Sequence, residues 1–552
     1  MLALALALTQ VMIPMRDGVR LATDVYTPGI TASSRYPVIL ERTPYNKATL
    51  VAQGRDYASK GYVYAVQDVR GRFKSDGIFE PFRNEGKDGY DTIEWLAAQP
   101  WCTGKIGMIG GSYDGLTQWH AAAEKPPHLV TIIPNVAPPG PFQNAPYDHG
   151  ILFSSAMLTW LQIIEDQSPL EDSPAHSLAR LDQAKLLRSV ASLPVADMDL
   201  RLFGRRIPAW RHWIEGPFDS GYWKPMQFAS KLRGVDIPVF HQSGWFDDDG
   251  IGSKLNYERL RSLGHRKQKL ILGPWGHTAR STRTERGRDF GEAAELDLAA
   301  EYLRWFDALL KGEGQPDYQT KLFVMGENRW LAGPEYPLPQ TRFERFYLAP
   351  GGRLSRIPVK DAKPGTYTFD PGRPTPSPRA LGEPAGRRHW QMAHKRADIL
   401  TYSTGPLTKP MTIAGPMSAV IHAASTAADT DFFVRISEED PAAGTAFLLA
   451  EGKVRARYRH SMTTPELLEP GRVYPFEIDL WQTAITIPVG KALMVEVASA
   501  SFPLFAPNLN TGRDNNRETK HQKASQTIHY AGRRASYVEL PVIDRPAVSS
   551  SQ

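Results

Sequence analysis

The chain has 552 residues, of which 41% are hydrophobic, 22% charged and 10% aromatic. This composition is ordinary for a large globular protein and excludes both disorder as the main state and a collagen-like repeat. The 65 Lys and Arg residues against 59 Asp and Glu give a net charge of +6, spread thinly over the chain. Because no basic face with interleaved aromatic residues stands out, we expect no nucleic-acid partner.

Cysteine usage and apolar runs set further limits. The single cysteine, Cys102, excludes intramolecular disulfides and Cys-based metal clusters. No segment has the ~20 consecutive apolar residues that cross a bilayer, so we expect no membrane partner. The run Leu2–Leu8 resembles the end of a signal-peptide apolar region, although it is short and no Lys or Arg precedes it. We expect a periplasmic or secreted protein, with the cytoplasm as the alternative.

Up to about residue 145, short β-rich runs alternate with helical stretches. The predicted strands cover residues 20–26, 37–40, 63–66 and 105–109, and the predicted helices cover residues 89–99 and 116–124. Strands that alternate with helices favour a mostly parallel sheet covered on both faces. This part of the chain is therefore expected to form an α/β domain.

The pattern changes after this domain. Residues 146–232 have few β-branched runs but contain amphipathic stretches, such as a predicted helix over residues 178–187, which indicates a helical insertion. The α/β rhythm then returns in residues 233–339. Its predicted elements are strands at 237–240, 270–272 and 322–325 and a helix at 296–310.

Residues 340–552 show no helical periodicity. Short alternating segments replace it, with predicted strands at 432–436, 454–458 and 493–497. Regular turn signals between such segments are typical of an all-β sandwich or jelly roll.

The strongest functional signal is a strand–turn–helix segment with a serine in a glycine-rich turn. Residues 105–115 read KIGMIGGSYDG, so a buried strand runs through two glycines into Ser112 and then into a helix. Such a turn exposes the serine hydroxyl at the carboxyl edge of a sheet, the geometry of a nucleophile elbow. Asp114 stands where the G-x-S-x-G pattern has its second glycine, and Gly115 follows. A purely structural glycine-rich turn is the alternative.

A nucleophilic serine needs a base, and the base needs a carboxylate that orients it. Of the 14 histidines, His277 follows a predicted strand in the sharp turn GPWGH. Asp247 comes earlier, after another predicted strand, in the segment GWFDDDG. The order Ser112, Asp247, His277 is the order of folds with a nucleophile elbow. Asp248 and Asp249 are alternatives to Asp247 as the orienting carboxylate.

Several spaced motifs resemble one family of serine hydrolases over nearly the whole chain. They are MRDGVRL at 15–21, RTPY at 42–45, QDVRGR at 67–72, SDG at 75–77, WCTGK at 101–105, the serine elbow, GWFD at 244–247, GPWGH at 273–277, DTDF at 429–432, RARY at 455–458 and a run from FP at 502–503 to NLNTG at 508–512. On these motifs the chain resembles the cocaine esterase / α-amino-acid ester hydrolase group, in the X-prolyl dipeptidyl peptidase class.

The resemblance implies a fold in three parts. An α/β-hydrolase domain, formed by residues 1–145 and 233–339, would carry an inserted helical cap at 146–232. A C-terminal jelly-roll β-sandwich would follow at 340–552.

The resemblance also implies roles for individual residues. The family's nucleophile, acid and base fall on Ser112, Asp247 and His277. Its oxyanion hole uses the tyrosine hydroxyl of the RTPY motif and the backbone N–H after the serine, which belong to Tyr45 and Tyr113 here. Both groups can donate to a developing oxyanion.

The α-amino-acid ester hydrolase branch further implies how the acyl group is recognised. It has acidic residues at the place of Asp114 and after the catalytic aspartate, where Asp248 and Asp249 stand, whereas the cocaine esterase branch has neutral residues there. Such a cluster binds the substrate's α-ammonium group through charge-assisted hydrogen bonds. Asp148 and Trp160 of the insertion complete the predicted substrate-binding residues. A solvated acidic turn is the alternative.

The combined expectation is a serine hydrolase that cleaves esters or amides of small acyl groups, such as α-amino-acid esters or β-lactam side-chain amides. We expect no cofactor and no metal, since neither a nucleotide-binding glycine motif nor ligands at metal-binding spacing appear. The expected partner is the small-molecule substrate, and a homo-oligomer stays open. The alternatives are an X-Pro dipeptidyl aminopeptidase and a non-catalytic protein whose jelly roll binds a carbohydrate or another partner.

Overall fold

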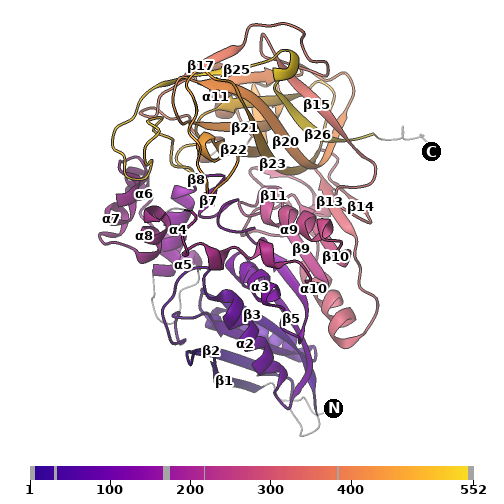
Figure 1. The fold of residues 1–552 in the computed structure, drawn as a ribbon. Helices are drawn as coiled ribbons and strands as arrows, with labels where there is room; N and C mark the ends of the chain where they lie inside the picture. The colour runs from indigo at the N-terminus through magenta and orange to yellow at the C-terminus, as the bar shows by residue number, and fades with distance from the viewer. Residues whose placement is uncertain (1–6, 30–33, 166–173, 217, 382–384, 545–552) are drawn as a thin grey trace, which may run out of the picture.

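The structure, a computed structural model, describes residues 7–29, 34–165, 174–216, 218–381 and 385–544. Figure 1 shows an α/β domain in the lower half of the view, a β domain above it, and the cap helices α4 to α8 at the left, between the two. The predicted fold class, an α/β-hydrolase domain with an inserted cap and a β-rich C-terminal domain, is confirmed.

The α/β domain is built on a ten-stranded sheet with the order β1-β2-β4-β3-β5-β6-β9-β10-β13-β14. In that order the strands are β1 (Ala7–Pro14), β2 (Arg20–Thr27), β4 (Val63–Asp68), β3 (Tyr36–Thr43), β5 (Cys102–Gly111), β6 (Leu129–Asn135), β9 (Val239–Gly244), β10 (Gln268–Gly273), β13 (Thr320–Val324) and β14 (Arg329–Gly333). The six neighbouring pairs from β4 to β13 are parallel, and the pairs at the two ends of the sheet are antiparallel.

Helices cover both faces of this sheet, which explains why its central strands are apolar on both sides. The covering helices are α1 (Val51–Ser59), α2 (Glu85–Ala97), α3 (Tyr113–Glu124), α9 (Ile251–Ser262) and α10 (Leu298–Phe306). Val38 and Leu40 of β3 pack in one cluster with α2 and α3, while Ile39 packs on the opposite face with α1 and α10. The carboxyl ends of the parallel strands therefore lie at one edge, where loops are free to carry a site.

The cap is inserted between β6 and β9. Its helices are α4 (Ser154–Glu165), α5 (Pro174–Ala179), α6 (Gln183–Val190), α7 (Met198–Phe203) and α8 (Pro208–Glu215). The prediction of one helix over residues 178–187 is wrong. The Asp182 side chain accepts a hydrogen bond from the Lys185 backbone N–H at 2.8 Å, which caps a new helix and separates α5 from α6.

The C-terminal domain carries a twelve-stranded sheet whose strands are joined by pairing. Its strands are β15 (Thr341–Ala349), β16 (Arg353–Ser355), β17 (Gly365–Phe369), β18 (Ala385–Gly386), β19 (Leu400–Ser403), β20 (Met411–Ser425), β21 (Asp431–Asp440), β22 (Thr445–Arg455), β23 (Tyr474–Ile487), β24 (Ala492–Ala498), β25 (Ala524–Ile528) and β26 (Tyr537–Ile543). Helix α11 (Arg387–Lys395), which the sequence did not indicate, packs on it.

One predicted strand of this domain ends early. The strand expected over residues 454–458 stops at Arg455, and a 3₁₀ turn follows. The Arg455 side chain donates to both oxygens of Asp431 at 2.8 and 2.9 Å, and Arg457 donates to Asp429 at 2.8 Å. These ion pairs hold Arg455 and Arg457 against Asp431 and Asp429 where the strand ends, and local alternation does not reveal such long-range contacts.

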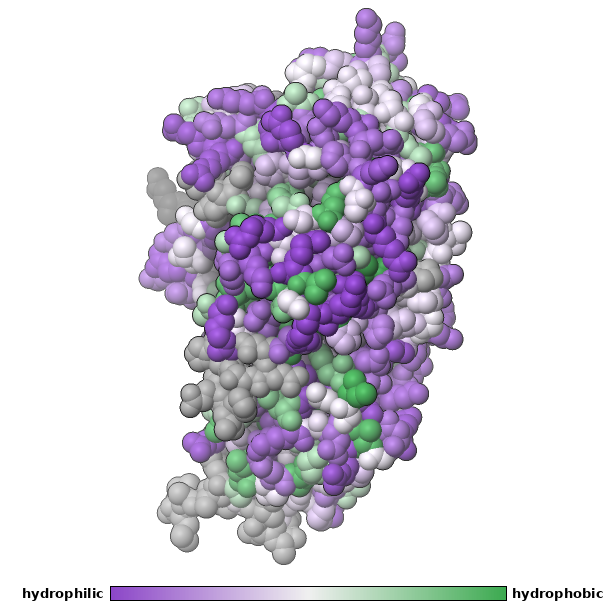
Figure 2. Space-filling view, turned by 90° about the vertical axis from the view of Figure 1, so that its left-hand side faces the viewer, coloured by the Kyte–Doolittle hydropathy of each residue, from purple (hydrophilic) through white to green (hydrophobic). Residues whose placement is uncertain are grey.

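Most of the leader-like run Leu2–Leu8 lies outside the described residues, and Ala7 and Leu8 begin β1. Among the helices of the described residues, none has the length and apolar character to cross a membrane. Figure 2, which faces the cap side, shows a largely hydrophilic surface with scattered apolar residues.

Candidate active site

Ser112 lies in a strained turn between β5 and α3. Its backbone has φ 60° and ψ −122°, a conformation that non-glycine residues rarely adopt. The turn is held by hydrogen bonds from the Ser112 N–H to the Asn135 carbonyl and from the Leu116 N–H to the Ser112 carbonyl, both 2.9 Å long. The strained turn presents the serine at the carboxyl edge of the sheet, as a nucleophile elbow does.

The glycines around the serine explain the departure from the G-x-S-x-G pattern. A side chain is accommodated at Asp114 because Gly110 lies opposite: a Cβ added at Gly110 would approach the Asp114 Cβ to 2.6 Å. Gly115 takes over the packing role of the missing glycine, since a Cβ there would lie 2.8 Å from both the Ala137 Cβ and the Asn135 carbonyl oxygen. The helix α3 can therefore pack tightly on β6.

Ser112, His277 and Asp247 form one chain of hydrogen bonds. The His277 Nε2 lies 3.0 Å from the Ser112 Oγ, and the His277 Nδ1 lies 2.6 Å from the Asp247 Oδ1. Asp247 follows β9 and His277 follows β10, so neighbouring parallel strands deliver the two side chains to the same edge of the sheet as Ser112. The structure thus brings together the three residues that the sequence predicted as a triad.

Hydrogen bonds fix the carboxylate that meets His277. Asp247 is 1% exposed, and its Oδ2 accepts from the Ser243 hydroxyl at 2.5 Å while its Oδ1 accepts from the Asp249 backbone N–H at 2.9 Å. Asp248 instead turns outward and pairs with Arg379 of the β domain at 2.5 Å. Asp249 approaches His277 from another side, with 3.9 Å between its Oδ2 and the His277 Nε2. In this geometry Asp247 is the carboxylate bonded to the Nδ1.

The surrounding carboxylates change the acidity of His277. Burial alone would lower the pKa of the imidazole, but the charges of Asp247, Asp249 and Asp248 outweigh it and raise the pKa to about 9. Burial raises the pKa of Asp249 to about 7, against the opposing charge of His277. A general base must be neutral to accept a proton, so these charges favour the inactive imidazolium at low pH.

We therefore expect kcat/KM for a neutral ester to rise with pH until His277 is deprotonated, with an acid limb that reflects the raised pKa. The Asp249→Asn variant removes one negative charge beside the ring, and its acid limb should move to lower pH. The pH–rate profile of a p-nitrophenyl ester measures both, with the Asp236→Asn variant, at a surface carboxylate paired with Lys267, as the control. An unchanged limb in Asp249→Asn would contradict this electrostatic account.

Two hydrogen-bond donors face the serine. Tyr113 is the first residue of α3, where the backbone N–H has no partner within the helix and the helix dipole favours negative charge. The Tyr45 hydroxyl accepts a hydrogen bond from the Trp160 Nε1–H at 2.9 Å, and the neighbouring Ser112 hydroxyl also lowers its pKa; burial outweighs both effects and raises the pKa, so the phenol stays protonated. The role of these two donors as an oxyanion hole stays a prediction.

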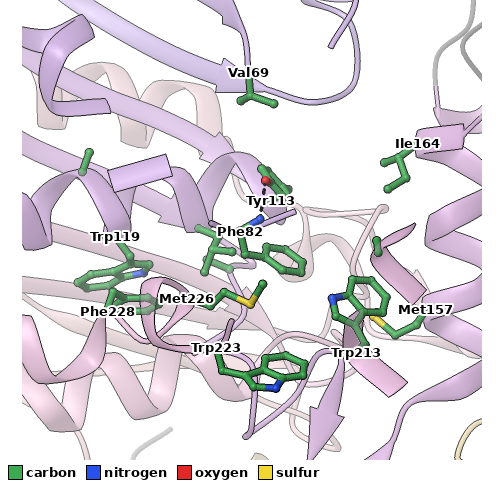
Figure 3. Close-up of a cluster of buried hydrophobic side chains, with 14 of the residues drawn as sticks. Val69, Phe82, Tyr113, Trp119, Met157, Ile164, Trp213, Trp223, Met226 and Phe228 are labelled. Carbon is green, nitrogen blue, oxygen red and sulfur yellow. Dashed lines mark hydrogen bonds between the residues drawn. The ribbon is translucent and has the colours of Figure 1, made fainter. Parts of the chain in front are cut away.

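The Tyr113 side chain anchors this turn. Its hydroxyl donates to the Glu85 Oε1 at 2.8 Å and accepts from the Phe82 backbone N–H at 2.9 Å, the bond drawn in Figure 3. Glu85 in turn pairs with the fully buried Arg42 at 2.9 Å. The position of the Tyr113 backbone N–H therefore depends on a buried network of the hydrolase domain.

The predicted substrate-binding carboxylates lie in different surroundings. Asp148 is 2% exposed and is held by His149 at 2.6 Å and by Lys453 of β22. Asp114 lies behind the elbow, where a Cβ at Gly110 would contact both it and the Glu41 carboxylate. Asp249, beside His277, is the member of the set that the structure places next to the triad.

Glu41 and Asp114 behave as an acid pair. Burial raises the pKa of Glu41 to about 7, although Tyr64 and Gln53 donate to its Oε2 at 2.5 and 2.7 Å. Burial and the neighbouring Glu41 charge raise the pKa of Asp114 well above its usual range. The pair therefore retains a proton near neutral pH. The sequence analysis did not select Glu41. Its local signal is that a carboxylate ends the apolar run PVILE at residues 37–41.

Contacts from the β domain were also missed. Lys453 and Arg379 reach Asp148 and Asp248 from segments more than 100 residues away in the chain, so no local motif could indicate them. Within the residues that the structure describes, no group of three His, Cys, Asp or Glu side chains is arranged to hold a metal ion.

A sheet of this topology with a serine at its elbow, bonded through a histidine to a buried aspartate, defines a serine hydrolase. Comparison with known families narrows the class further. The family model of the X-Pro dipeptidyl-peptidase (S15 family) matches residues 17–279, and that of the X-Pro dipeptidyl-peptidase C-terminal non-catalytic domain matches residues 315–539. The chain belongs to the X-Pro dipeptidyl-peptidase (S15) family.

Individual relatives agree with this assignment. The chain is 33% identical to a cocaine esterase from Rhodococcus sp. (strain MB1 Bresler), over 97% of this chain and 98% of the relative. It is similar to the solved structure of an α-amino acid ester hydrolase, with a TM-score of 0.83 and 25% identity over 98% of this chain and 97% of that one. An aminopeptidase from the marine sediment archaeon Thaumarchaeota archaeon shares the fold, with a TM-score of 0.82 and 24% identity over 98% and 96%. The resemblance seen in the sequence is confirmed.

Proposed function

We propose that this serine hydrolase cleaves esters or amides of small acyl groups through an acyl-enzyme, with α-amino-acid esters and β-lactam side-chain amides as the substrate class. The observation that carries the proposal is the continuous hydrogen-bond chain from Ser112 through His277 to Asp247. The ester-cleaving names of the cocaine esterase and the α-amino acid ester hydrolase support the substrate class.

In the proposed mechanism each of these side chains has one step. Ser112 Oγ attacks the substrate carbonyl while His277 Nε2 takes its proton, and Asp247 holds the Nδ1–H and stabilises the imidazolium. The Tyr45 hydroxyl and the Tyr113 N–H receive the oxyanion. As the tetrahedral intermediate collapses, His277 returns the proton to the leaving group, and a water activated by His277 then hydrolyses the acyl-enzyme.

Asp249 is our candidate for binding an α-ammonium group. Its side chain is 16% exposed, and among the described residues its ion-pair contact is the His277 imidazole at 3.9 Å. An ammonium group bound there would be next to the acyl carbon held at Ser112. It would also keep Asp249 ionised, because a nearby positive charge opposes the effect of burial on its pKa.

We expect the Asp249→Asn variant to raise KM for phenylglycine methyl ester by about 10- to 150-fold, since a hydrogen bond to a charged group contributes about 1.5–3 kcal/mol. KM for phenylacetic acid methyl ester, which lacks the ammonium, should stay within about twofold. Steady-state kinetics on the two esters measure the difference.

Asp248→Asn is the matched control, because Asp248 pairs with Arg379 and half of its side chain is exposed. It should leave the ratio of the two KM values unchanged. Equal effects of Asp249→Asn on both esters would rule out recognition of the amino group by this carboxylate.

An X-Pro dipeptidyl aminopeptidase is the second candidate, because the family models carry that description and such substrates also present an α-ammonium group. A panel of p-nitrophenyl esters, α-amino-acid esters, a β-lactam and Ala-Pro-p-nitroanilide separates the two. The proposal expects the highest kcat/KM on the α-amino-acid esters. The highest value on Ala-Pro-p-nitroanilide would assign peptidase activity instead.

A further inference from the structure

Trp160 joins the cap to the proposed oxyanion hole. It lies on α4 and stacks on Tyr113, with 5.9 Å between ring centroids and 13° between ring planes, and on Phe82, at 5.5 Å and 16°. Its indole Nε1–H donates a hydrogen bond to the Tyr45 hydroxyl oxygen at 2.9 Å. One cap side chain thus contacts both residues that would stabilise the oxyanion.

The chemistry of this bond sets the direction of the Tyr45 hydroxyl. An indole N–H can only donate, so the Tyr45 oxygen must accept. With that lone pair occupied, the single phenolic proton is directed elsewhere, and the Ser112 hydroxyl is a neighbouring group that lowers the pKa of Tyr45. A hydroxyl that accepts one hydrogen bond is also polarised into a stronger donor.

A second contact holds the same two segments together. Arg72 is 2% exposed, and its Nε donates to the carbonyl of Pro44, the residue before Tyr45, at 2.9 Å. Its Nη1 donates to the carbonyl of Ile164, one turn beyond Trp160 on α4. The loop that carries Tyr45 and the cap helix that carries Trp160 are therefore fixed to each other through a buried guanidinium.

We propose that Trp160 is a positioning residue of the oxyanion hole: its indole N–H orients and polarises the Tyr45 hydroxyl, so the hole is complete only when cap helix α4 is docked. The inference rests on the proposed role of Tyr45 as an oxyanion donor. Trp160 then affects the rate of the chemical step, in addition to any contact with the acyl group. The cap is then part of the catalytic geometry.

Trp213 of the cap provides a matched control. It is fully buried and stacks on Trp160 with 6.3 Å between ring centroids, but among the described residues its indole N–H has no hydrogen-bond partner. Figure 3 shows it on the cap side of the aromatic cluster, beside Met157 of α4. Trp213→Phe therefore measures the change in kcat when an indole of the same stack is replaced by a phenyl ring and no hydrogen bond to Tyr45 is lost.

The test is a double-mutant cycle on the full chain, with kcat and KM measured on one p-nitrophenyl ester. The variants are Trp160→Phe, Tyr45→Phe, the double variant and Trp213→Phe, each checked for folding by thermal unfolding. We expect Trp160→Phe to lower kcat about tenfold, with KM within twofold, and to lower it more than Trp213→Phe does. In the Tyr45→Phe background, Trp160→Phe should change kcat less than twofold, because the hydroxyl that it positions is gone.

The outcomes separate the inference from the function on which it rests. Equal losses of kcat from Trp160→Phe in both backgrounds, or a loss no larger than that of Trp213→Phe, would overturn the positioning role while leaving Tyr45 as an oxyanion donor. An unchanged kcat in Tyr45→Phe alone would overturn both the oxyanion role and the inference. Hydrolysis that depends on Ser112 would stand in either case.

Discussion

Replacing Ser112 by alanine is expected to lower kcat by about 10⁵- to 10⁶-fold, the loss seen when the nucleophile of a comparable triad is removed. The hydroxyl oxygen forms the bond of the acyl-enzyme, and it lies 3.0 Å from the His277 Nε2, which takes its proton. Residual hydrolysis above the uncatalysed rate should come from the oxyanion donors and binding alone. Steady-state or single-turnover hydrolysis of a p-nitrophenyl ester measures the loss.

The control for this change is Ser59→Ala, at an exposed serine whose hydroxyl bonds to the Asp56 carbonyl at the end of α1. It should retain full activity. The backbone conformation at position 112 is as unfavourable for alanine as for serine. The unfolding temperature of Ser112→Ala should therefore stay close to that of the native chain. A folded Ser112→Ala protein with full esterase activity would contradict the assignment of the nucleophile.

Replacing Asp247 by asparagine should lower kcat by about 10⁴-fold, as in a comparable triad whose orienting aspartate becomes an amide. The amide can donate to the His277 Nδ1, which stabilises the wrong tautomer and leaves the Nε2 protonated and unable to accept from Ser112. The imidazolium that forms during the reaction also loses its counter-charge. The kcat of an ester without an amino group measures the effect without interference from substrate recognition.

Asp248→Asn is the matched control for this variant, since its carboxylate pairs with Arg379 and not with His277. It should retain kcat within a few-fold. If Asp248→Asn or Asp249→Asn instead caused the large loss, the orienting carboxylate would have been assigned to the wrong member of the three consecutive aspartates.

The parts of the site that the sequence could predict are those fixed by local chain geometry. The elbow can be predicted from the sequence because a strand, two glycines, a serine and a helix must follow one another directly. Asp247 and His277 can be predicted because each follows a buried strand, and neighbouring parallel strands end at the same edge of the sheet. The resemblance to a known family added Tyr45, which local pattern alone describes only as an aromatic residue in a loop.

The parts that the sequence could not predict depend on contacts between distant segments. Asp148 was expected to bind substrate, but its surroundings are set by Lys453 from the β domain. Asp114 was expected to bind substrate too, yet it lies close to the Glu41 carboxylate, and a Cβ at Gly110 would contact both side chains. The cap helix over residues 178–187 was divided by a capping aspartate, and the strand at 454–458 was shortened by a buried ion pair. In each case a long-range or side-chain contact outweighed the local pattern.

The most direct test of the central claim, that Ser112 is the activated nucleophile of a hydrolase, is covalent labelling with a fluorophosphonate followed by peptide mass spectrometry. At a pH where the His277 imidazole is neutral, a serine bonded to it should be phosphonylated, whereas an unactivated serine should not. The account predicts one adduct, on the peptide that contains Ser112, and its loss in both Ser112→Ala and Asp247→Asn at equal exposure times. An unlabelled native chain, or an adduct on another serine that persists in Ser112→Ala, would contradict it.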